Sequence, residues 1–490
     1  MRISEWLRGS AVLATASAIA LAGVAMPAPA TAQSSPSPAV ASSEGARPNI
    51  LFILVDDMGF GDLSVMGNRK VATPNIDRLA QQGVLMTRFY DAAPICSSSR
   101  AGFFTGRFPA EVSFVGITAA REKNAKLGQA DWLDPKLPNL ARMLKDAGYA
   151  TAHIGKWHLG GGRDIGDAPW PTAYGFDESF TTFEGLGPRV LVSDEERNLS
   201  DQSAELGQGP FSWKVKKKLT PLYGDKTIDF VKRNKDKPWF VQLWLNDVHD
   251  PWAPATKDLA AVRGKGENAD DEKFLASLVG MDRALGRLIE RLEAMGEAQD
   301  TLIVLTSDNG PSPLKRYMKD GATPPGSAGD LRGRKFSLYE GGIRQPLILR
   351  WPGHVRAGHR DEKTIGHGVD LLPTFARIAG APVGADARGI DLTPVLAGEE
   401  IAERPPMFWG YGKAGAPDQP NLSPNPRDVS PRFAVRDGDW KLLMNAGETD
   451  VQLYDVVADP GEAHDLAAKQ PAIRDRLKAK LRGWMAGLAK

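Results

Sequence analysis

Cysteine is almost absent from this sequence, because Cys96 is the only one in 490 residues. A single thiol cannot form a disulfide within its own chain, so a disulfide framework is excluded. In an exported protein, an unpaired cysteine indicates either pairing with another molecule or a reactive role. The polar run Ser97–Arg100 that follows argues against a buried cysteine that acts only as a small hydrophobic residue.

The sequence also has almost no net charge, since 61 Lys and Arg residues and 60 Asp and Glu residues leave a formal charge of +1. A neutral chain argues against attraction of the whole surface to nucleic acid or to a membrane, so recognition of an anion must be local. Beyond the N-terminal region, no segment is apolar enough to span a bilayer. We therefore expect neither a nucleic-acid partner nor a membrane span after signal removal.

The N-terminal region has the pattern of an export signal. Residues 1–32 combine a positively charged start, the apolar run Ala11–Met26 and a small-residue cleavage site. A membrane anchor is the alternative, but the run is rich in alanine and is followed at once by Pro27 and Pro29. We therefore predict a cleaved signal peptide and an exported protein, either periplasmic or secreted.

The rest of the chain alternates apolar strands with amphipathic helices. Strands are expected at 49–57, 84–90, 149–154, 239–245 and 301–309, and helices at 73–83, 140–148 and 271–295. This alternation predicts an α/β fold with a large, mostly parallel mixed sheet flanked by helices. Functional sites in such sheets form beyond the carboxyl ends of the strands.

Composition changes along the chain suggest its organisation into domains. Residues 33–46 are rich in Ser, Pro and Ala and predict a flexible linker. We assign 47–399 to a catalytic domain and 400–490 to a smaller C-terminal α+β domain. Two long stretches rich in Gly and Pro, Gly310–Arg334 and Gly410–Pro431, are candidate binding loops.

Acidic and amide side chains end two of the expected strands. Asp56 and Asp57 end the first, and Asp308 and Asn309 end another. Adjacent carboxylates repel each other unless a cation or hydrogen bonds compensate. Because all four donors are hard oxygens, the residues predict a Ca²⁺ site, with Mg²⁺ as the alternative.

The environment of Cys96 favours an anion. If a helix begins just after Cys96, Arg100 lies one turn along on the same side, and the helix N-terminus adds its own positive end. Such a pocket is expected to lower the pKa of an unmodified thiol. A thiolate that faced a metal-bound anion would meet like charge, however, so a bare cysteine fits the pocket poorly.

The segment "CSSSRAGFFTGR" resembles the signature of type I sulfatases, Cys-x-Pro-Ser-Arg-x-x-x-x-Thr-Gly with alanine often at the proline position. Further segments resemble the family in the same order, namely "NILFILVDDMGFGDLS", "TPNIDRLAQQG", "HIGKWHLG", "TLIVLTSDNG", "LRGRKFSLYEGGIRQPLILRWPG" and "WKLL" with "LYDVVADPGEAHDLA". The resemblance implies an alkaline-phosphatase-like sandwich with a smaller C-terminal domain.

The resemblance also implies a modification of Cys96. In the family, a maturation enzyme oxidises this cysteine to Cα-formylglycine during export, and the hydrated aldehyde is the nucleophile and a metal ligand. One departure stands at Ser98, which occupies the place of the proline or alanine that the maturation enzyme reads. Conversion of Cys96 is therefore expected to be slow, partial or dependent on a tolerant maturation enzyme.

The remaining site residues are also assigned by resemblance. Lys156 and His158 match the basic pair of the family, and Lys335 matches the lysine that contacts the sulfate and the leaving oxygen. His249 matches the histidine that protonates the leaving alcohol, whereas His158 removes a proton from the nucleophile so that sulfate is released. Arg100 joins the two lysines in offsetting the charge of the sulfate.

The resemblance implies hydrolysis of sulfate monoesters, of an aryl or a glycan alcohol. A phosphonate or phosphate ester hydrolase of the same superfamily is one alternative. A binding protein for sulfated glycans, in which Ser98 blocks maturation and Cys96 stays a thiol, is the other. The sequence does not separate substrate-stacking tryptophans from core tryptophans among Trp170, Trp252 and Trp409.

Two other groups of residues are assigned away from the site. His354, His359 and His367 follow a loop-like "WPG" and are expected at the surface. In "EGGIR", residues 340–344, the two glycines suggest a tight turn and Arg344 is expected to pair with a carboxylate.

Overall fold

A computed structural model describes residues 47–194, 198–314, 324–412, 423 and 425–488. The predicted signal peptide and linker, residues 1–46, lie outside the described residues, as do parts of both candidate binding loops. Within the described part of the chain, no helix combines the length and apolar character needed to cross a bilayer.

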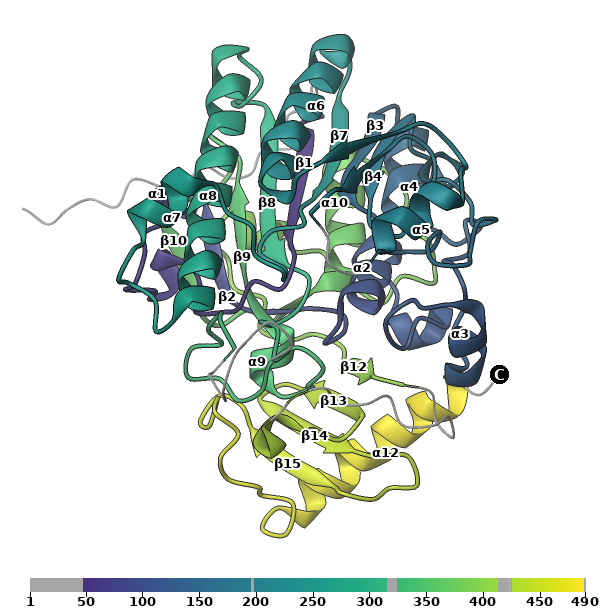
Figure 1. Ribbon diagram of the computed structural model, residues 1–490. Helices are drawn as coiled ribbons and strands as arrows, with labels where there is room; N and C mark the ends of the chain where they lie inside the picture. Colours follow the sequence, from purple (N-terminus) through teal and green to yellow (C-terminus); the bar gives the residue numbers. More distant parts are fainter. Residues whose placement is uncertain (1–46, 195–197, 315–323, 413–422, 424, 489–490) are drawn as a thin grey trace, which may run out of the picture. The chain divides into compact units, whose positions relative to one another are not determined.

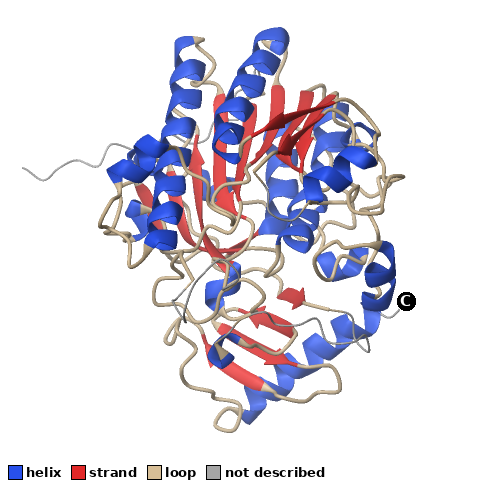
Figure 2. Ribbon diagram, viewed as in Figure 1, coloured by secondary structure: helices blue, strands red, loops and turns tan. Residues whose placement is uncertain are grey.

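A large sheet forms the centre of the N-terminal region, and helices lie on both sides of it (Figures 1 and 2). Its strands run in the order β10-β2-β9-β8-β1-β7-β3-β4-β5-β6, with β11 paired to β2. The strands are β1 (Asn49–Val55), β2 (Val84–Tyr90), β3 (Ala150–Lys156), β4 (Glu178–Thr182), β5 (Arg189–Val192), β6 (Phe211–Lys214), β7 (Trp239–Trp244), β8 (Thr301–Ser307), β9 (Arg344–Arg350), β10 (His359–Asp361) and β11 (Gly366–His367). Only β9 among these strands runs against the others, so the predicted mostly parallel mixed sheet is confirmed.

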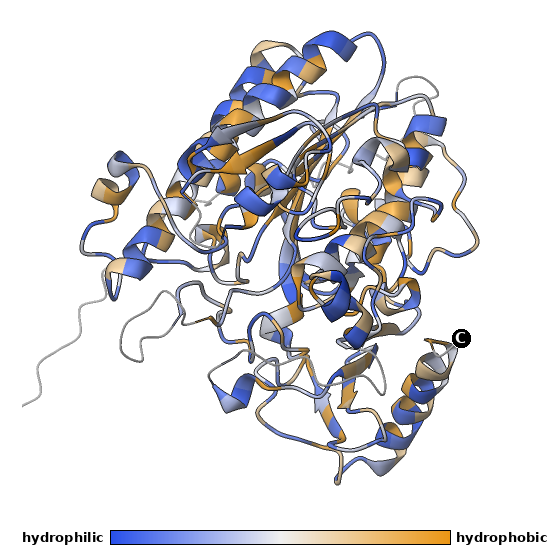
Figure 3. Cartoon of the chain, turned by 45° about the vertical axis from the view of Figure 1, so that its right-hand side comes forward, coloured by the Kyte–Doolittle hydropathy of each residue, from blue (hydrophilic) through white to orange (hydrophobic). Residues whose placement is uncertain are grey.

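Strand β1 shows why the sheet needs cover on both faces. It pairs in parallel with β7 and β8, and all seven of its residues are buried. Leu51 and Ile53 face one layer of helices, whereas Phe52 and Leu54 face the other. A strand that is apolar on both faces is stable only between two layers. In Figure 3 the strands are more hydrophobic than the surrounding helices, which carry both hydrophilic and hydrophobic residues.

The helices divide between the two faces according to their apolar residues. One layer contains α1 (Pro74–Gln81), α6 (Leu219–Asn234) and α8 (Ala269–Ala294), and the other contains α2 (Cys96–Thr105), α4 (Leu140–Asp146) and α10 (Leu371–Ala379). The remaining helices are α3 (Arg121–Leu127), α5 (Leu199–Glu205), α7 (Thr256–Ala261), α9 (Glu340–Ile343), α11 (Thr393–Leu396) and α12 (Pro471–Leu488). The helix expected at 271–295 is therefore confirmed as α8, which begins two residues earlier.

A smaller antiparallel sheet follows in the C-terminal region, as predicted (Figure 1). It has the order β12-β13-β14-β15 and contains β12 (Met407–Gly410), β13 (Phe433–Asp437), β14 (Trp440–Met444) and β15 (Gln452–Asp455). Helix α12 packs on one face through Leu477 and Leu481. The other face packs Trp409 against Tyr90 of the large sheet.

A buried network of charges joins the two sheets. Lys441 Nζ of β14 lies 2.9 Å from Glu340 Oε1 and 2.9 Å from Glu462 Oε1, and all three side chains are fully buried. Tyr90 of β2 donates to Glu340 Oε2 over 2.5 Å, and Arg436 of β13 donates to the Tyr90 hydroxyl oxygen. Helix α9, which carries Glu340, is thereby held against the C-terminal sheet.

The segment "EGGIR" differs from the expected tight turn, although its structural role is confirmed. Residues 340–343 form helix α9, and Arg344 lies 3.5 Å from Glu340 Oε2, as an ion pair. The glycines are required for close packing, because a Cβ on Gly341 would lie 2.3 Å from Gly333 O and one on Gly342 would lie 2.1 Å from Ser337 O.

One histidine expected at the surface is instead fully buried. His367 of β11 packs its ring against Phe108 and Trp409, and burial holds its pKa well below the usual value. The expectation of a surface residue was wrong because β11 pairs with β2 inside the protein. His354 and His359 are partly exposed.

Candidate active site

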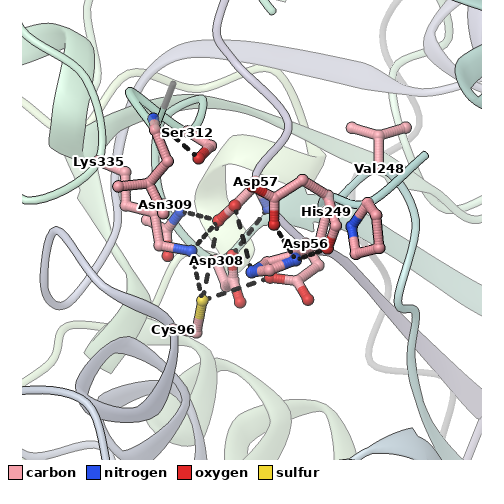
Figure 4. A network of polar contacts seen from close by, with 12 residues as sticks. Asp56, Asp57, Cys96, Val248, His249, Asp308, Asn309, Ser312 and Lys335 are labelled. Carbon is pink, nitrogen blue, oxygen red and sulfur yellow. Dashed lines mark hydrogen bonds and ion pairs between the residues drawn. The ribbon is translucent and has the colours of Figure 1, made fainter. Parts of the chain in front are cut away.

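The carboxyl ends of β1 and β8 bring the predicted acidic residues together. The two strands are parallel neighbours whose last residues, Val55 and Ser307, are in register. Asp308 Oδ1 consequently accepts a hydrogen bond from the Asp57 amide over 3.2 Å, and Asn309 Nδ2 donates to Asp57 Oδ1 over 2.7 Å. The predicted clustering of these side chains is seen in Figure 4.

Asp57 adopts a backbone conformation that few residues with a side chain adopt. Its φ is 60°, in the left-handed region, as are the φ of His158 at 57° and of Phe336, next to Lys335, at 74°. Such conformations cost about 1–3 kcal/mol each and persist only where the surroundings impose them. Left-handed backbone at two predicted site residues and beside a third marks a site whose geometry is maintained at the expense of local stability.

Cys96 begins helix α2 and lies directly against the acidic cluster. Its Sγ is 3.3 Å from Asp56 Oδ1, 3.8 Å from Asp57 Oδ1 and 3.1 Å from Lys335 Nζ. All ten residues of α2 are buried, including Ser97–Arg100. The polar run after Cys96 therefore does not indicate exposure, as the sequence suggested, because the hydroxyls of Ser97 and Ser98 and the guanidinium of Arg100 have partners inside the protein.

The environment of the thiol opposes its ionisation. Burial and the neighbouring Asp308 raise the pKa of Cys96 well above its usual value, although Lys156 and Lys335 act in the opposite direction. The expectation that the pocket lowers the thiol pKa was wrong, because burial and the neighbouring carboxylates outweigh the two lysines. An unmodified Cys96 is thus a neutral thiol here and a poor nucleophile.

Arg100 lies one helical turn beyond Cys96, as its spacing predicted. Its guanidinium donates from Nε to Asp308 Oδ2 over 2.9 Å and from Nη1 to the Lys156 carbonyl over 3.0 Å, and it lies over the Trp244 ring at 5.1 Å. The side chain is fully buried. This buried cation positions the end of β8 and supplies positive charge beside Asp308.

Two lysines oppose the two aspartates of β1. Lys156 Nζ lies 2.5 Å from Asp56 Oδ2, and Lys335 Nζ lies 2.5 Å from Asp57 Oδ1. Although burial raises the pKa of Asp56, Lys156 and His249 hold it well below the usual value. The aspartates are therefore ionised and the lysines charged, so that fixed charges of both signs surround Cys96.

The two predicted histidines reach the cavity from different strands. His249 follows β7, with Nε2 3.6 Å from Asp57 Oδ2 and Nδ1 3.1 Å from Asp250 Oδ1. His158 follows β3 and is buried, with Nε2 3.9 Å from Glu184 Oε2. Burial lowers the pKa of both imidazoles, most strongly for His158, where Lys156 adds to the effect.

The residues at the end of β1 fit a divalent cation of the hard type. Asp57 Oδ2 and Asn309 Oδ1 are buried and accept no hydrogen bond from any described residue. One ligand atom from each of Asp56, Asp57, Cys96 and His249 also lies within 4.8 Å of the others. Ca²⁺ and Mg²⁺ prefer oxygen ligands such as these, which no hydrogen-bond donor occupies. His249 adds a possible imidazole ligand that the sequence did not predict.

A cavity of about 180 Å³ opens from Cys96 toward the surface. Its wall contains the predicted Lys156, His158, His249 and Lys335. None of the three tryptophans considered for substrate stacking contributes to it: Trp409 is fully buried, Trp252 donates to the Val248 carbonyl, and Trp170 lines a different cavity.

Several charged residues of the wall escaped the sequence analysis, among them Glu184 and Lys216. Glu184 is buried, accepts a hydrogen bond from the Thr118 hydroxyl and lies 2.9 Å from Arg163 Nε. Lys216 donates through Nζ to the carbonyl of His249 over 2.5 Å and to that of Pro251 over 3.0 Å. Neither lies at the end of a long apolar strand, in the helix that begins at Cys96 or in a segment that resembles the family, so none of the signals used applied to them.

The sequence was compared with protein families and with known proteins. Residues 48–381 match the family model described as "Sulfatase", and residues 333–486 match "N-sulphoglucosamine sulphohydrolase, C-terminal". Human N-acetylgalactosamine-6-sulfatase is 32% identical over 75% of this chain and 69% of its own length. Human arylsulfatase A is 30% identical over 88% of this chain and 86% of its own length.

Solved structures show the same fold. The structure of Ps i-CgsB in complex with k-i-k-neocarrahexaose superimposes with a TM-score of 0.73 at 26% identity, and the match covers 90% of this chain and 93% of the other. The phosphonate monoester hydrolase of Agrobacterium radiobacter superimposes with a TM-score of 0.61 at 22% identity, over 90% of this chain and 96% of the other. At that identity the second likeness concerns the fold alone.

Proposed function

Because the chain belongs to the sulfatase family, we propose that it hydrolyses the sulfate monoester of a carbohydrate through a formylglycine derived from Cys96. The observation that carries the proposal is the contact of Cys96 Sγ with Asp56 and Lys335 in one buried cluster. A carbohydrate is favoured over a simple aryl alcohol because N-acetylgalactosamine-6-sulfatase and the neocarrahexaose complex are among the relatives.

The metal and the modified residue each have a place in this cluster. We assign the metal to Asp56, Asp57, Asp308, Asn309 and the modified residue 96, with Ca²⁺ as the ion and Mg²⁺ as the alternative. When bound, the cation supplies Lewis acidity and orientation, and formylglycine supplies a hydrated aldehyde as the nucleophile. The buried oxygens of Asp57 and Asn309 that accept no hydrogen bond support the assignment.

The cations of the cavity hold the sulfate group. Arg100, Lys156 and Lys335 are buried donors with fixed partners, so they need little reorganisation as charge moves during the reaction. Lys335 contacts both the sulfate and the leaving oxygen, and the 3.1 Å between its Nζ and Cys96 Sγ supports this role. Loss of one such donor typically lowers the rate by about 10²-fold or more.

The histidines move the protons. His249 donates a proton to the departing oxygen, and its position beside Asp57 and Asp250 favours the protonated ring once an anionic substrate is bound. His158 accepts a proton from the hydroxyl at position 96 as sulfate is released. Its lowered pKa keeps the ring neutral before that step, as a general base requires.

Removal of His249 is expected to affect poor leaving groups most. His249→Ala should lower kcat/KM by about 10²–10⁴-fold on an alkyl or carbohydrate sulfate, but much less on 4-nitrophenyl sulfate, whose alcohol leaves without protonation. The measurement is a comparison of the two substrates in the wild type, in His249→Ala and in His464→Ala, a histidine whose side chain is 81% exposed. Equal losses on both substrates would contradict the role of His249 as an acid.

Removal of the divalent cation is expected to lower both activity and thermal stability. Without the ion, the carboxylates of Asp56, Asp57 and Asp308 repel one another in a buried site. A cation present at 100 times its Kd adds about 2.7 kcal/mol to the stability of the folded state. Chelation followed by titration with Ca²⁺ or Mg²⁺ should restore activity and raise Tm together. Asp57→Asn should abolish the Tm response, and an unchanged response in that variant would overturn the assignment.

A phosphonate or phosphate ester hydrolase is the second candidate function. The fold of the Agrobacterium enzyme is compatible with it, and tetrahedral anions of similar size fit the same donors. Comparison of kcat/KM for 4-nitrophenyl sulfate and for 4-nitrophenyl phenylphosphonate decides between the two. Preference for the phosphonate would refute sulfate ester hydrolysis as the main activity.

Maturation and export complete the proposal. We propose that a formylglycine-generating enzyme acts on Cys96 during export to the periplasm or the medium, with residues 1–32 as signal peptide. Ser98, which donates to the Gly116 carbonyl over 2.9 Å in the folded protein, stands where that enzyme reads proline or alanine.

A further inference from the structure

The edge of the large sheet carries an unusual exposed strand. Strand β6 is the last strand in the order of the sheet, and all four of its residues are exposed. Phe211 and Trp213 expose 42% and 40% of their surfaces, and their rings contact each other edge to face with centroids 6.3 Å apart. Lys214 ends the strand, and Lys216, Lys217 and Lys218 follow it.

Protection of the sheet edge explains only the lysines. Charged residues on an edge strand prevent pairing with the strands of other molecules, but exposed aromatic residues increase that hazard. Among the described residues, Trp170 is the only other phenylalanine or tryptophan with comparable exposure. Two of these three exposed side chains thus lie two residues apart on one strand, rather than being scattered singly over the surface.

The strand leads directly into the active-site cavity. Strands β1, β7, β3, β4, β5 and β6 pair in parallel, so β6 ends at the same edge of the sheet as Asp56 and Asp57. Trp213 is in register with Leu191, which lines the cavity. Lys216, three residues or about 10 Å along the strand direction from Trp213, is itself part of the cavity wall.

We infer that Phe211, Trp213, Lys214, Lys217 and Lys218, here called the β6 surface, bind the remainder of a sulfated glycan chain while one of its sulfate esters occupies the cavity. The inference rests on the proposed function and makes it more specific. The substrate is an oligosaccharide or polysaccharide with several sulfate groups, rather than a monosaccharide.

The chemistry of the β6 surface matches such a chain on two counts. Aromatic rings pack against the apolar faces of sugar rings, and ammonium groups attract sulfate groups without a requirement for fixed geometry. Lys214, Lys217 and Lys218 are exposed, and among the described residues no carboxylate forms an ion pair with them. The chain as a whole is nearly neutral, so the four lysines among residues 214–218 do not reflect its overall composition.

Binding is measured with the full chain in its Cys96→Ala form, which removes turnover. Chondroitin 6-sulfate and ι-carrageenan serve as the sulfated probes, and dextran serves as the neutral one. We expect at least one sulfated probe to bind with an affinity that falls as salt increases, and dextran not to bind. Phe211→Ala/Trp213→Ala should weaken that binding at least tenfold, and Lys214→Gln/Lys217→Gln/Lys218→Gln should weaken it and reduce its dependence on salt.

Matched substitutions elsewhere act as controls. Lys232→Gln/Lys235→Gln/Lys237→Gln removes three exposed lysines near the end of α6, and Trp170→Ala removes an exposed tryptophan from the other cavity. Both should bind the probes within about twofold of the parent protein. A thermal melt shows whether Phe211→Ala/Trp213→Ala still folds. If it does not, the lysine variant Lys214→Gln/Lys217→Gln/Lys218→Gln tests the inference in its place.

Turnover separates this inference from the proposed function. With Cys96 restored, variants of the β6 surface should lower kcat/KM on a sulfated oligosaccharide at least tenfold relative to that on 4-nitrophenyl sulfate. A wild type that cleaves no sulfate ester refutes the proposed function, whatever it binds. Three results would overturn the β6 inference. The wild type cleaves sulfate esters but Cys96→Ala binds neither sulfated probe, or the β6 variants bind a probe as well as the parent Cys96→Ala protein does. The third is a dimer in sedimentation that Phe211→Ala/Trp213→Ala dissociates.

Discussion

Cys96→Ala is expected to abolish sulfate ester hydrolysis, with kcat/KM on 4-nitrophenyl sulfate reduced on the order of 10⁴-fold or more. The physical reason is that Cys96 presents its nucleophilic atom directly to Asp56 and Asp57. Ser97 exchanges a hydrogen bond with Thr118, and Ser98 donates to the Gly116 carbonyl, so both neighbouring hydroxyls have other partners. The lysines at the site are charged and therefore cannot attack.

The fold should tolerate this substitution. Alanine at the first position of α2 leaves the backbone unchanged and removes a thiol whose close polar neighbours, Asp56 and Lys335, also bind other groups. Unfolding in urea should therefore shift by only about 1 kcal/mol. Retention of activity within tenfold of the wild type would show that residue 96 is not the nucleophile.

Mass analysis of the peptide around residue 96 in the wild type completes this prediction. We expect a fraction of the native protein to carry formylglycine, and Ser98→Pro to enlarge that fraction because it restores the residue that the maturation enzyme reads. Specific activity should increase in the same proportion. An intact, alkylatable thiol in all molecules, together with binding of a sulfated glycan, would instead support a binding protein.

The site could be predicted from the sequence where it depends on strand ends and helix spacing. Asp56 and Asp308 follow long apolar strands, and parallel neighbours end at one edge of a sheet, so their convergence required only the order of the elements. Arg100 followed in the same way, because four residues make about one helical turn.

Other parts of the site required the family resemblance or were missed. Lys335 reaches Cys96 because its loop folds back, with its amide bound to the Pro311 carbonyl and Phe336 in a left-handed conformation. No local pattern encodes that path. Glu184 was missed for a similar reason, since it and Phe183 both have positive φ in a short connection whose direction the sequence does not reveal.

Burial was the property least accessible to sequence reasoning. Ser97, His367 and Lys441 are polar and lie next to polar or loop-like segments, yet each is fully buried. Phe211 and Trp213 are the opposite case, aromatic residues that are exposed. Aromatic residues at every second position fit any half-buried strand, and their exposure here depends on the position of β6 at the end of the sheet. The pairing order of strands, which is a long-range property, decides both cases.

The interface between the two sheets provides the second large prediction. Lys441→Met is expected to destabilise the protein by about 3–5 kcal/mol, because removal of one member of a buried ionic cluster leaves the others uncompensated. Lys441 Nζ is 2.9 Å from each of two carboxylates that are fully buried. Burial raises the pKa of Glu340, but Lys441 and Arg436 outweigh burial and lower that pKa to about 2. For Glu462, burial prevails and raises the pKa to about 7.

Lys480→Met is the matched control, because it also removes a lysine that lies 2.9 Å from a carboxylate, here Asp437. That lysine side chain is 38% exposed, and an exposed pair of this kind contributes only about 0–1 kcal/mol. Urea unfolding of both variants therefore tests burial rather than the presence of an ion pair.

If Lys441→Met lowers the free energy of unfolding no more than Lys480→Met does, the buried network does not stabilise the interface. If it costs several kcal/mol, a second substitution, Glu462→Gln, should recover part of the loss, because it removes one of the two carboxylates that Lys441 had compensated.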